Sequence, residues 1–265
     1  MTAPEGGAPG GDPAGSIISP TLIAHLLEVR RRLLNSVATL LILFCCLFPF
    51  QNKVFVWVAR PMLEKLPSGS SMIATGVTSP FMTPMKLTLV VALFLTVPVF
   101  LWHIWRFVSP ALYKRERRMF FPLLISSVVL FYVGVAFAYF ILFPVAFAFL
   151  ANAAPEGVKV MTDINAYLDF VLTTFFAFGV AFEVPVAIVL MVWMGFSSPG
   201  KLKKLRPYAL LAAFFVGFLL APPDVVSMTL LAVPVYLLYE LGMLMARLLV
   251  PGSREVDAQR EQGAA

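Results

Sequence analysis

The chain has 265 residues, of which 60% are hydrophobic and only 13% are charged. About a quarter of the residues in a soluble globular domain are charged, so this composition excludes an ordinary soluble enzyme. It indicates a protein that crosses a membrane several times. The two Cys and two His argue against a disulfide framework or a His/Cys metal cluster, and the net charge of +6 raises the question of nucleic-acid binding.

Both ends of the chain differ in composition from its middle. Residues 1–24 are rich in Gly, Pro and Ala and contain no Lys or Arg, so we expect a disordered tail. We do not expect a signal peptide there, because a basic segment followed by an apolar one is missing. Residues 248–265 are expected to form a second tail, and residues 25–247 a single membrane domain.

Six apolar stretches within residues 25–247 predict six transmembrane helices in an all-α fold. The third stretch is longer than a perpendicular helix needs, so it should tilt or bend near Pro144. The predicted spans are residues 33–50, 87–105, 119–147, 168–196, 208–221 and 225–246.

The last two spans are expected to be short. Residues 208–221 number 14, which gives about 21 Å of helix against a hydrocarbon core of about 30 Å. The Pro222-Pro223-Asp224 connection then predicts a short hairpin, with the bilayer thinned or hydrated beside it if both helices span. A buried re-entrant pair of helices is the alternative.

Basic residues are distributed unevenly between the two sides of the predicted spans. Fifteen Lys and Arg residues fall on the side of both termini. The positive-inside rule therefore places both termini in the cytoplasm. Because these charges are divided among four short segments, they indicate topology rather than a nucleic-acid surface. The other five are Lys53, Arg60, Lys65, Lys86 and Lys159.

The outer segment between the first two spans is too long for a simple turn. Its apolar residues, including Val54, Phe55 and Trp57, suggest an amphipathic helix at the membrane interface. Arg60-Pro61 is expected to break this helix. Lys86 is expected to extend toward the interface at the mouth of the second span.

The sequence contains no catalytic motif that we can identify. His25 and His103 lie on different flanks of the apolar spans, and motifs of zinc proteases, nucleotide-binding loops and serine hydrolases are absent. Adjacent Cys45 and Cys46 point to different faces of a helix, so packing or lipid contact is their expected role. We therefore expect no enzymatic activity, no cofactor and no metal site.

Glu183 lies at the centre of the apolar stretch Phe170–Phe196. An ionisable side chain at that depth is costly unless it faces protein or water. Pro185 is expected to free a backbone carbonyl beside it and to kink the helix. The position suits a polar contact with a partner helix or a passing substrate, or a proton site. The alternative is a neutral carboxyl group bonded to a neighbouring helix.

Three further acidic residues lie near the ends of predicted spans. Asp169 and Asp224 are expected to be helix caps or interfacial anchors. Glu240 is expected to mark the cytoplasmic end of a short span.

Two more acidic residues lie alone in basic cytoplasmic segments. Glu28 precedes a run of three arginines that ends at Arg32, and Glu116 lies within Lys114–Arg118. The spacing favours local pairing, such as Glu28 with Arg32 at i,i+4, which contributes roughly 0.2–0.5 kcal/mol. The alternative is that the two carboxylates receive a basic peptide.

These segments resemble the TatC family, the multi-spanning subunits of the twin-arginine protein translocase. The resemblance extends from about residue 20 to residue 247, in the family's order. Its most specific parts are the Pro-Ala-Leu-Tyr loop with its Glu-Arg-Arg end and the Phe-Glu-Val-Pro span. The matching segments are residues 25–34 (HLLEVRRRLL), 79–81 (SPF), 107–118 (FVSPALYKRERR), 178–185 (FGVAFEVP) and 206–224 (from RPY to PPD).

The resemblance implies a concave, glove-like bundle in the bacterial inner membrane that recognises Arg-Arg signal peptides on folded cargo. Family roles transfer onto Glu28 and Glu116 as the acids that contact the twin arginines. Glu183 becomes the buried polar position inside the concavity. The implied signal-peptide site comprises Glu28, Glu116, Arg30, Arg32 and Phe107.

The resemblance also implies partners. Small single-span TatA/TatB-type subunits, membrane lipids and further copies of the chain are expected, with transport driven by the proton-motive force. Pro61, Asp224 and Met228 are the candidate docking or outer-loop positions. Met228 departs from the polar Gln that family members often have where partner helices dock.

Simple energetics limits what the two acids achieve alone. Arg binds carboxylates bidentately in a way that Lys cannot copy. Two such contacts contribute roughly 3–6 kcal/mol, whereas micromolar binding needs about 8 kcal/mol. The apolar segment of the signal peptide must therefore bind as well.

Two other functions remain as alternatives. A secondary transporter that uses Glu183 as a proton carrier predicts internal repeats, and the short hairpin occurs only once. A scaffold without a role in cargo binding predicts normal export of twin-arginine cargo in its absence.

Overall fold

The computed structural model describes residues 20–64, 72–108, 120–152, 161–220 and 225–250. These residues are helical apart from short connections and one isolated parallel β-bridge between Ile73 and Asp163. The elements are α1 (Pro20–Leu47), the 3-10 helix η1 (Phe48–Phe50), α2 (Gln51–Leu63), α3 (Ser79–Val108), α4 (Phe120–Phe137), the π-helix η4 (Ala138–Leu142), α5 (Phe143–Asn152), α6 (Ile164–Ala181), α7 (Val184–Trp193), α8 (Pro199–Lys204), α9 (Arg206–Leu220) and α10 (Val225–Leu249).

Five helical segments in the described ranges are long and apolar enough to cross a membrane, and α9 is a shorter apolar helix. The 15 residues of α9 give about 22 Å of helix, in agreement with the predicted short span. α10 has 25 residues, includes Glu240 and ends three residues beyond the predicted span 225–246. The all-α prediction with six apolar spans is confirmed.

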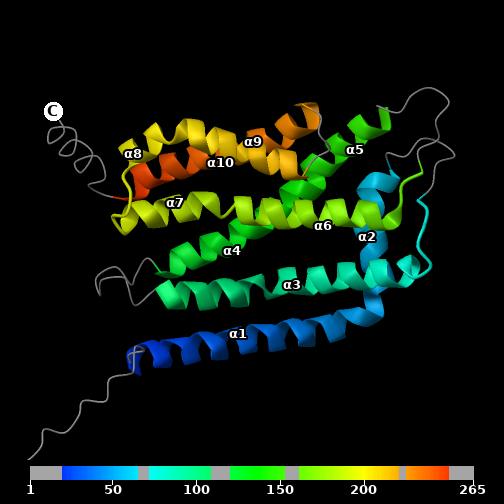
Figure 1. Cartoon of the computed structure of the whole chain (residues 1–265), viewed down its shortest axis with the longest axis horizontal. Coiled ribbons are helices and arrows are strands. Elements are labelled where there is room, and N and C mark those ends of the chain that lie inside the picture. Colours follow the sequence, from blue (N-terminus) through cyan, green and yellow to red (C-terminus); the bar gives the residue numbers. More distant parts are fainter. Residues whose placement is uncertain (1–19, 65–71, 109–119, 153–160, 221–224, 251–265) are drawn as a thin grey trace, which may run out of the picture.

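The spans lie roughly side by side, and α2 crosses them at one end of the molecule (Figure 1). α1 packs chiefly against α3, which also contacts α4 and α6. At the opposite edge, α10 packs against α7 and α9. The start of α1, the end of α3, α8 and the end of α10 all lie at the end of the molecule away from α2 (Figure 1). The predicted topology requires this grouping.

Two helix boundaries differ from the sequence prediction. α1 begins at Pro20, so residues 20–24 are helical although they were expected in the N-terminal tail. α10 ends at Leu249, so residues 248 and 249 are helical although they were expected in the C-terminal tail. Residues 1–19 and 251–265 lie outside the described part of the chain. The irregularity expected near Pro144 is a π-helical turn, η4, that directly precedes α5 (Figure 1).

The prediction that Arg60-Pro61 breaks the outer helix is wrong. α2 continues to Leu63, with Pro61 buried inside its last turns. Proline has no N–H to donate to the carbonyl four residues earlier, which is that of Trp57. The Tyr139 hydroxyl donates to this carbonyl at 2.8 Å instead. A side chain from η4 thus replaces the missing backbone bond.

α4 and α6 approach each other closely at two glycines. A Cβ atom added at Gly134 of α4 would lie 2.5 Å from the carbonyl oxygen of Phe178. One added at Gly179 of α6 would lie 2.5 Å from Cε2 of Phe131. Both phenylalanine side chains are buried. Small residues permit this close contact between membrane helices, where packing drives association.

At the end near α2, Asp163 ties the segment before α3 to the start of α6. Its Oδ1 accepts from the backbone N–H groups of Asn165 at 2.7 Å and Ala166 at 3.2 Å, and so caps α6. Its Oδ2 accepts from the Thr75 backbone N–H at 3.0 Å and from the Thr75 hydroxyl. The bonds from Thr75 and the helix N-terminus lower the pKa of Asp163 to about 2.

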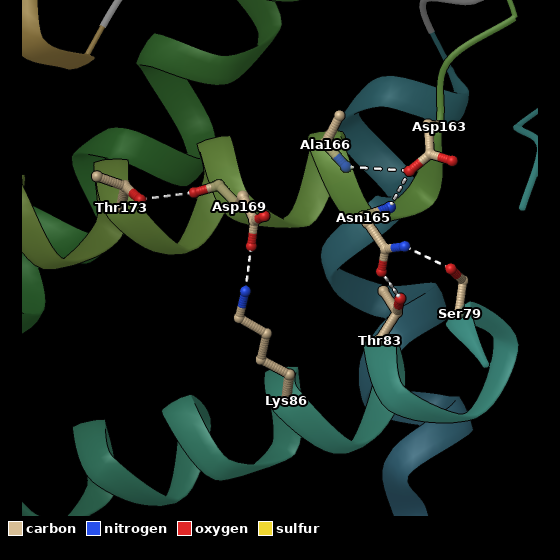
Figure 2. A network of polar contacts seen from close by, with 8 residues as sticks. All are labelled: Ser79, Thr83, Lys86, Asp163, Asn165, Ala166, Asp169 and Thr173. Atoms are coloured by element: carbon tan, nitrogen blue, oxygen red, sulfur yellow. Dashed lines mark hydrogen bonds and ion pairs between the residues drawn. The ribbon is translucent and has the colours of Figure 1, made fainter. Parts of the chain in front are cut away.

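Three further contacts join α3 to α6 in the same region (Figure 2). The Asn165 side chain donates to the Ser79 hydroxyl and accepts from the Thr83 hydroxyl. Lys86 forms an ion pair with Asp169. Asp169 therefore bridges two helices and is not the cap of α6, so the cap expectation is wrong for this residue. Lys86 lies inside α3 rather than at its mouth.

We expect Gly134→Ala to lower the thermal unfolding midpoint of the purified full chain in detergent. The new methyl group would overlap the backbone of Phe178, and overpacked core sites typically cost about 1–3 kcal/mol. Val133→Ala is the control, because Val133 is exposed on the same helix. Equal midpoints for the two variants would contradict the close α4–α6 contact.

The bonds that Asp163 accepts from Thr75 and from the start of α6 should depend on pH. A lowered pKa means that the stabilisation is complete above the ordinary value of 3.8 and is lost as the pH falls toward about 2. We expect the hydrogen-exchange protection of the Thr75 amide to decline over this range. Asp163→Ala should remove the protection at neutral pH, whereas Asp169→Ala should keep it. Equal protection in both variants would show that Asp163 does not hold this segment.

Candidate functional site

The candidate site at the end of the molecule away from α2 begins with Glu28 on α1. Its Oε1 forms an ion pair with Arg32 one turn later, as the i,i+4 spacing predicts. The Glu28 side chain is 53% exposed, whereas that of Arg32 is 16% exposed. Arg32 also donates to the backbone carbonyl of His103 on α3 at 3.4 Å. Arg32 thereby links α1 to α3 while Glu28 keeps access to the surroundings.

A groove of about 250 Å³ lies between α1 and α3 directly beside this pair. Its walls are almost entirely apolar. Nδ1 of His103 is buried and has no hydrogen-bond partner among the described residues. The residues around the groove are Val29, Arg32, Leu33, Ser36, Phe100, His103 and Ile104.

The groove and Glu28 together suit a ligand with a cationic head and an apolar continuation. A half-exposed carboxylate can accept from an incoming guanidinium. Arg30 and Arg31 are exposed beside Glu28, and their positive charge disfavours the binding of an unspecific cation there. The structure thus brings Glu28, Arg30 and Arg32 to one turn of α1, next to an apolar surface.

Three other residues predicted for functional sites, Glu116, Phe107 and Asp224, have side chains outside the described part of the structure. Glu116 lies in the undescribed connection 109–119. Phe107 is in the last turn of α3, but its side chain lies outside the described part of the structure. Asp224 also falls in an undescribed segment, 221–224. Their predicted roles stay predictions.

Pro61 and Met228 occupy different elements. Pro61 is buried in α2, as described above. Met228 is half-buried near the start of α10. Its backbone carbonyl is the closest atom to a Cβ built at Gly217 of α9, at 2.7 Å. Met228 therefore marks the tight crossing of α9 and α10.

Glu183 forms a second polar site within the bundle. It lies in the short turn between α6 and α7, where Pro185 begins the new helix, so the predicted break is present. Its Oε2 accepts from the hydroxyl of Ser127 on α4, and Trp105 of α3 donates to the same hydroxyl at 3.4 Å. Oε1 is buried without a hydrogen-bond partner in the described ranges.

This geometry is compatible with a structural role of Glu183, in which it bonds a neighbouring helix, and with a functional role, in which it binds a further donor. The bond to Ser127 is the contact with a neighbouring helix that the structural interpretation expects. The second oxygen still has capacity for a donor, which the functional interpretation expects. Glu183 lies deep in its span and Glu28 near the start of α1, so they form separate sites.

A third polar cluster was missed by the sequence interpretation. Arg206 at the start of α9 forms an ion pair with Glu240 of α10, and Tyr236 donates to the other carboxylate oxygen at 2.8 Å. The expectation that Glu240 ends a short span is wrong, because its charge is matched inside the hairpin. The described residues contain no group of three or more His, Cys, Asp or Glu placed to hold a metal ion.

Comparisons with known proteins agree with this architecture. The family model for the Sec-independent protein translocase protein (TatC) matches residues 24–234. The Sec-independent protein translocase protein TatC of Escherichia coli (strain K12) is 57% identical over 233 residues, covering 88% of this chain and 90% of that protein. The TatC protein of Haemophilus influenzae is 52% identical over 237 residues, covering 89% and 93%.

Solved structures give the same result. A crystal structure described as the twin arginine translocase receptor TatC superimposes with a TM-score of 0.74 at 36% sequence identity. The match covers 84% of this chain and 98% of that one. The matched family model, the relatives and the shared fold together show that this chain belongs to the TatC family of multi-span membrane proteins of the twin-arginine translocase.

Proposed function

We propose that this chain is the signal-peptide receptor of a twin-arginine translocase in the bacterial inner membrane. In this proposal Glu28 and Glu116 bind the paired arginines of a signal peptide on a folded precursor. TatA/TatB-type single-span subunits and further copies of the chain complete the complex, which uses the proton-motive force and has no catalytic or nucleic-acid-binding role. A solved relative is described as a translocase receptor.

The observation that carries the proposal is the groove beside Glu28. The acids alone supply too little binding free energy, so a surface for the apolar part of the peptide is required. The apolar walls between α1 and α3 supply such a surface within one turn of the carboxylate. Arg32 keeps the Glu28 side chain oriented, because it is itself bonded to α3.

The proposal also assigns an orientation. The start of α1, the ends of α3 and α10, and α8, which carry basic residues in the sequence, lie at the end away from α2 (Figure 1). The positive-inside rule makes this the cytoplasmic end. Glu183 then lies along the path between the two faces, where its free oxygen suits a polar contact with a partner helix or cargo.

Glu28→Gln keeps the size of the side chain and removes its charge. We expect it to weaken binding of a twin-arginine signal peptide about tenfold, since one charge-assisted contact at a half-exposed site is lost. Photocrosslinking of the peptide to the full chain in membranes, over a range of peptide concentrations, measures this. Glu64→Gln is the matched control, because Glu64 forms the same i,i+4 pair with Arg60 on α2.

Two comparisons make this experiment decisive. A peptide with twin lysines should bind weakly to the parent chain and lose little in Glu28→Gln, because Lys lacks the bidentate fork. Unchanged crosslinking of the twin-arginine peptide in the double variant Glu28→Gln/Glu116→Gln would remove both acids from the proposed site.

The orientation has its own test. In a chain whose two cysteines are replaced by serine, Val77→Cys places a thiol at a fully exposed outer position, and Lys204→Cys places one at an exposed position of α8. A membrane-impermeant maleimide should label position 77 in intact spheroplasts. It should label position 204 only after permeabilisation. The reverse pattern would place Glu28 on the wrong side for a cytoplasmic receptor.

A further inference from the structure

We propose that α2 and the cavity beneath it form a binding site for one anionic phospholipid of the nearer leaflet. α2 lies across the ends of the spans (Figure 1). Its inner face is anchored by Val58 and Ala59, which are buried. Its outer face presents charged and apolar side chains together, which is the composition of an interfacial helix that contacts lipid headgroups.

Two cations on this outer face suit a phosphate group. Lys53 and Arg60 are seven residues apart, so they share one side of the helix. Arg60 uses its Nε for Glu64 at 2.9 Å, and its side chain has no other hydrogen-bond partner in the described ranges. A shallow hollow of about 550 Å³ follows this face. Its lining residues are Asn52, Lys53, Val56, Trp57, Arg60 and Leu63.

Trp57 connects this charged face to an apolar cavity. The indole is 58% exposed and stacks on the ring of Tyr139 at a centroid distance of 4.9 Å. It borders both the hollow on α2 and a cavity of about 280 Å³ among α2, α3, α4 and α6. Trp is favoured at the level of lipid headgroups, which is where such a connection belongs.

The cavity offers hydrocarbon contacts and almost no free polar group. The Tyr132 hydroxyl donates to the carbonyl of Phe94 at 3.1 Å, and the Tyr139 hydroxyl is bonded to the carbonyl of Trp57. Both rings therefore turn their apolar faces to the cavity. Water does not occupy such a space readily, because it finds too few partners.

The size and surroundings favour one acyl chain as the occupant. Leu95 and Phe140 line the cavity and are themselves exposed, so the cavity is bordered by exposed apolar side chains. The cavity is slightly below the roughly 300–1,000 Å³ of drug-sized ligand sites, and a helix about 10 Å wide would not enter it. An anionic headgroup is favoured over a zwitterionic one, because Lys53 and Arg60 would repel the choline or ethanolamine group.

The test uses the fluorescence of Trp57 in the purified, delipidated full chain. Phosphatidylglycerol with brominated acyl chains is titrated in detergent micelles, and brominated phosphatidylcholine is titrated in parallel. Subtracting the signal of Trp57→Phe isolates the quenching of this indole. We expect saturable quenching by phosphatidylglycerol at concentrations about tenfold lower than by phosphatidylcholine. Equal titration curves for the two lipids would overturn the proposal.

Variants of the protein separate the contribution of the lipid headgroup from that of the acyl chain. Lys53→Gln/Arg60→Gln should abolish the preference for phosphatidylglycerol, and Glu64→Gln should increase it by freeing Arg60. Ala136→Phe, which fills the cavity from α4, should reduce quenching by both lipids. Lys86→Gln is the control, because this lysine is already paired with Asp169. An unaltered preference in the double variant, with the unfolding midpoint retained, would exclude the headgroup site.

Discussion

A polar group that is shielded from water must find its partner within the protein, and this constraint organises the bundle. Glu183 is bonded through Ser127, and Glu240 is paired with Arg206 across the last hairpin. The carbonyl that Pro61 leaves without a donor receives the hydroxyl of Tyr139. In each case a side chain from a second helix supplies the contact, so the same bonds that satisfy polar groups also fix which helices are neighbours.

The sequence predicted the all-α fold and the number of apolar spans because hydropathy is a local property. It also predicted the Glu28–Arg32 pair and the break beside Glu183, since both follow from spacings of a few residues. It failed wherever the partner is distant along the chain. Asp169 pairs with Lys86, 83 residues away, and no local pattern reveals that choice. The continuation of α2 through Pro61 depends in the same way on η4.

Different polar contacts join the helices at the two ends of the molecule. Near α2, Asp163, Asn165 and Asp169 connect α6 to α3 and to the segment before it (Figure 2). At the other end, α1 packs against α3 and is joined to it by the Arg32 side chain, and much of the surface of α1 is exposed.

The half-exposed Glu28–Arg32 pair bears on how the proposed receptor would bind a peptide. In the proposed receptor role, a peptide guanidinium at Glu28 would compete with Arg32 for part of the carboxylate, because the Arg32 ion pair uses only Oε1. Because an exposed i,i+4 pair is weak, this competition opposes binding only slightly. In the proposed role the two acids together supply roughly 3–6 of the about 8 kcal/mol that micromolar binding needs, so apolar contacts in the groove must supply the remainder.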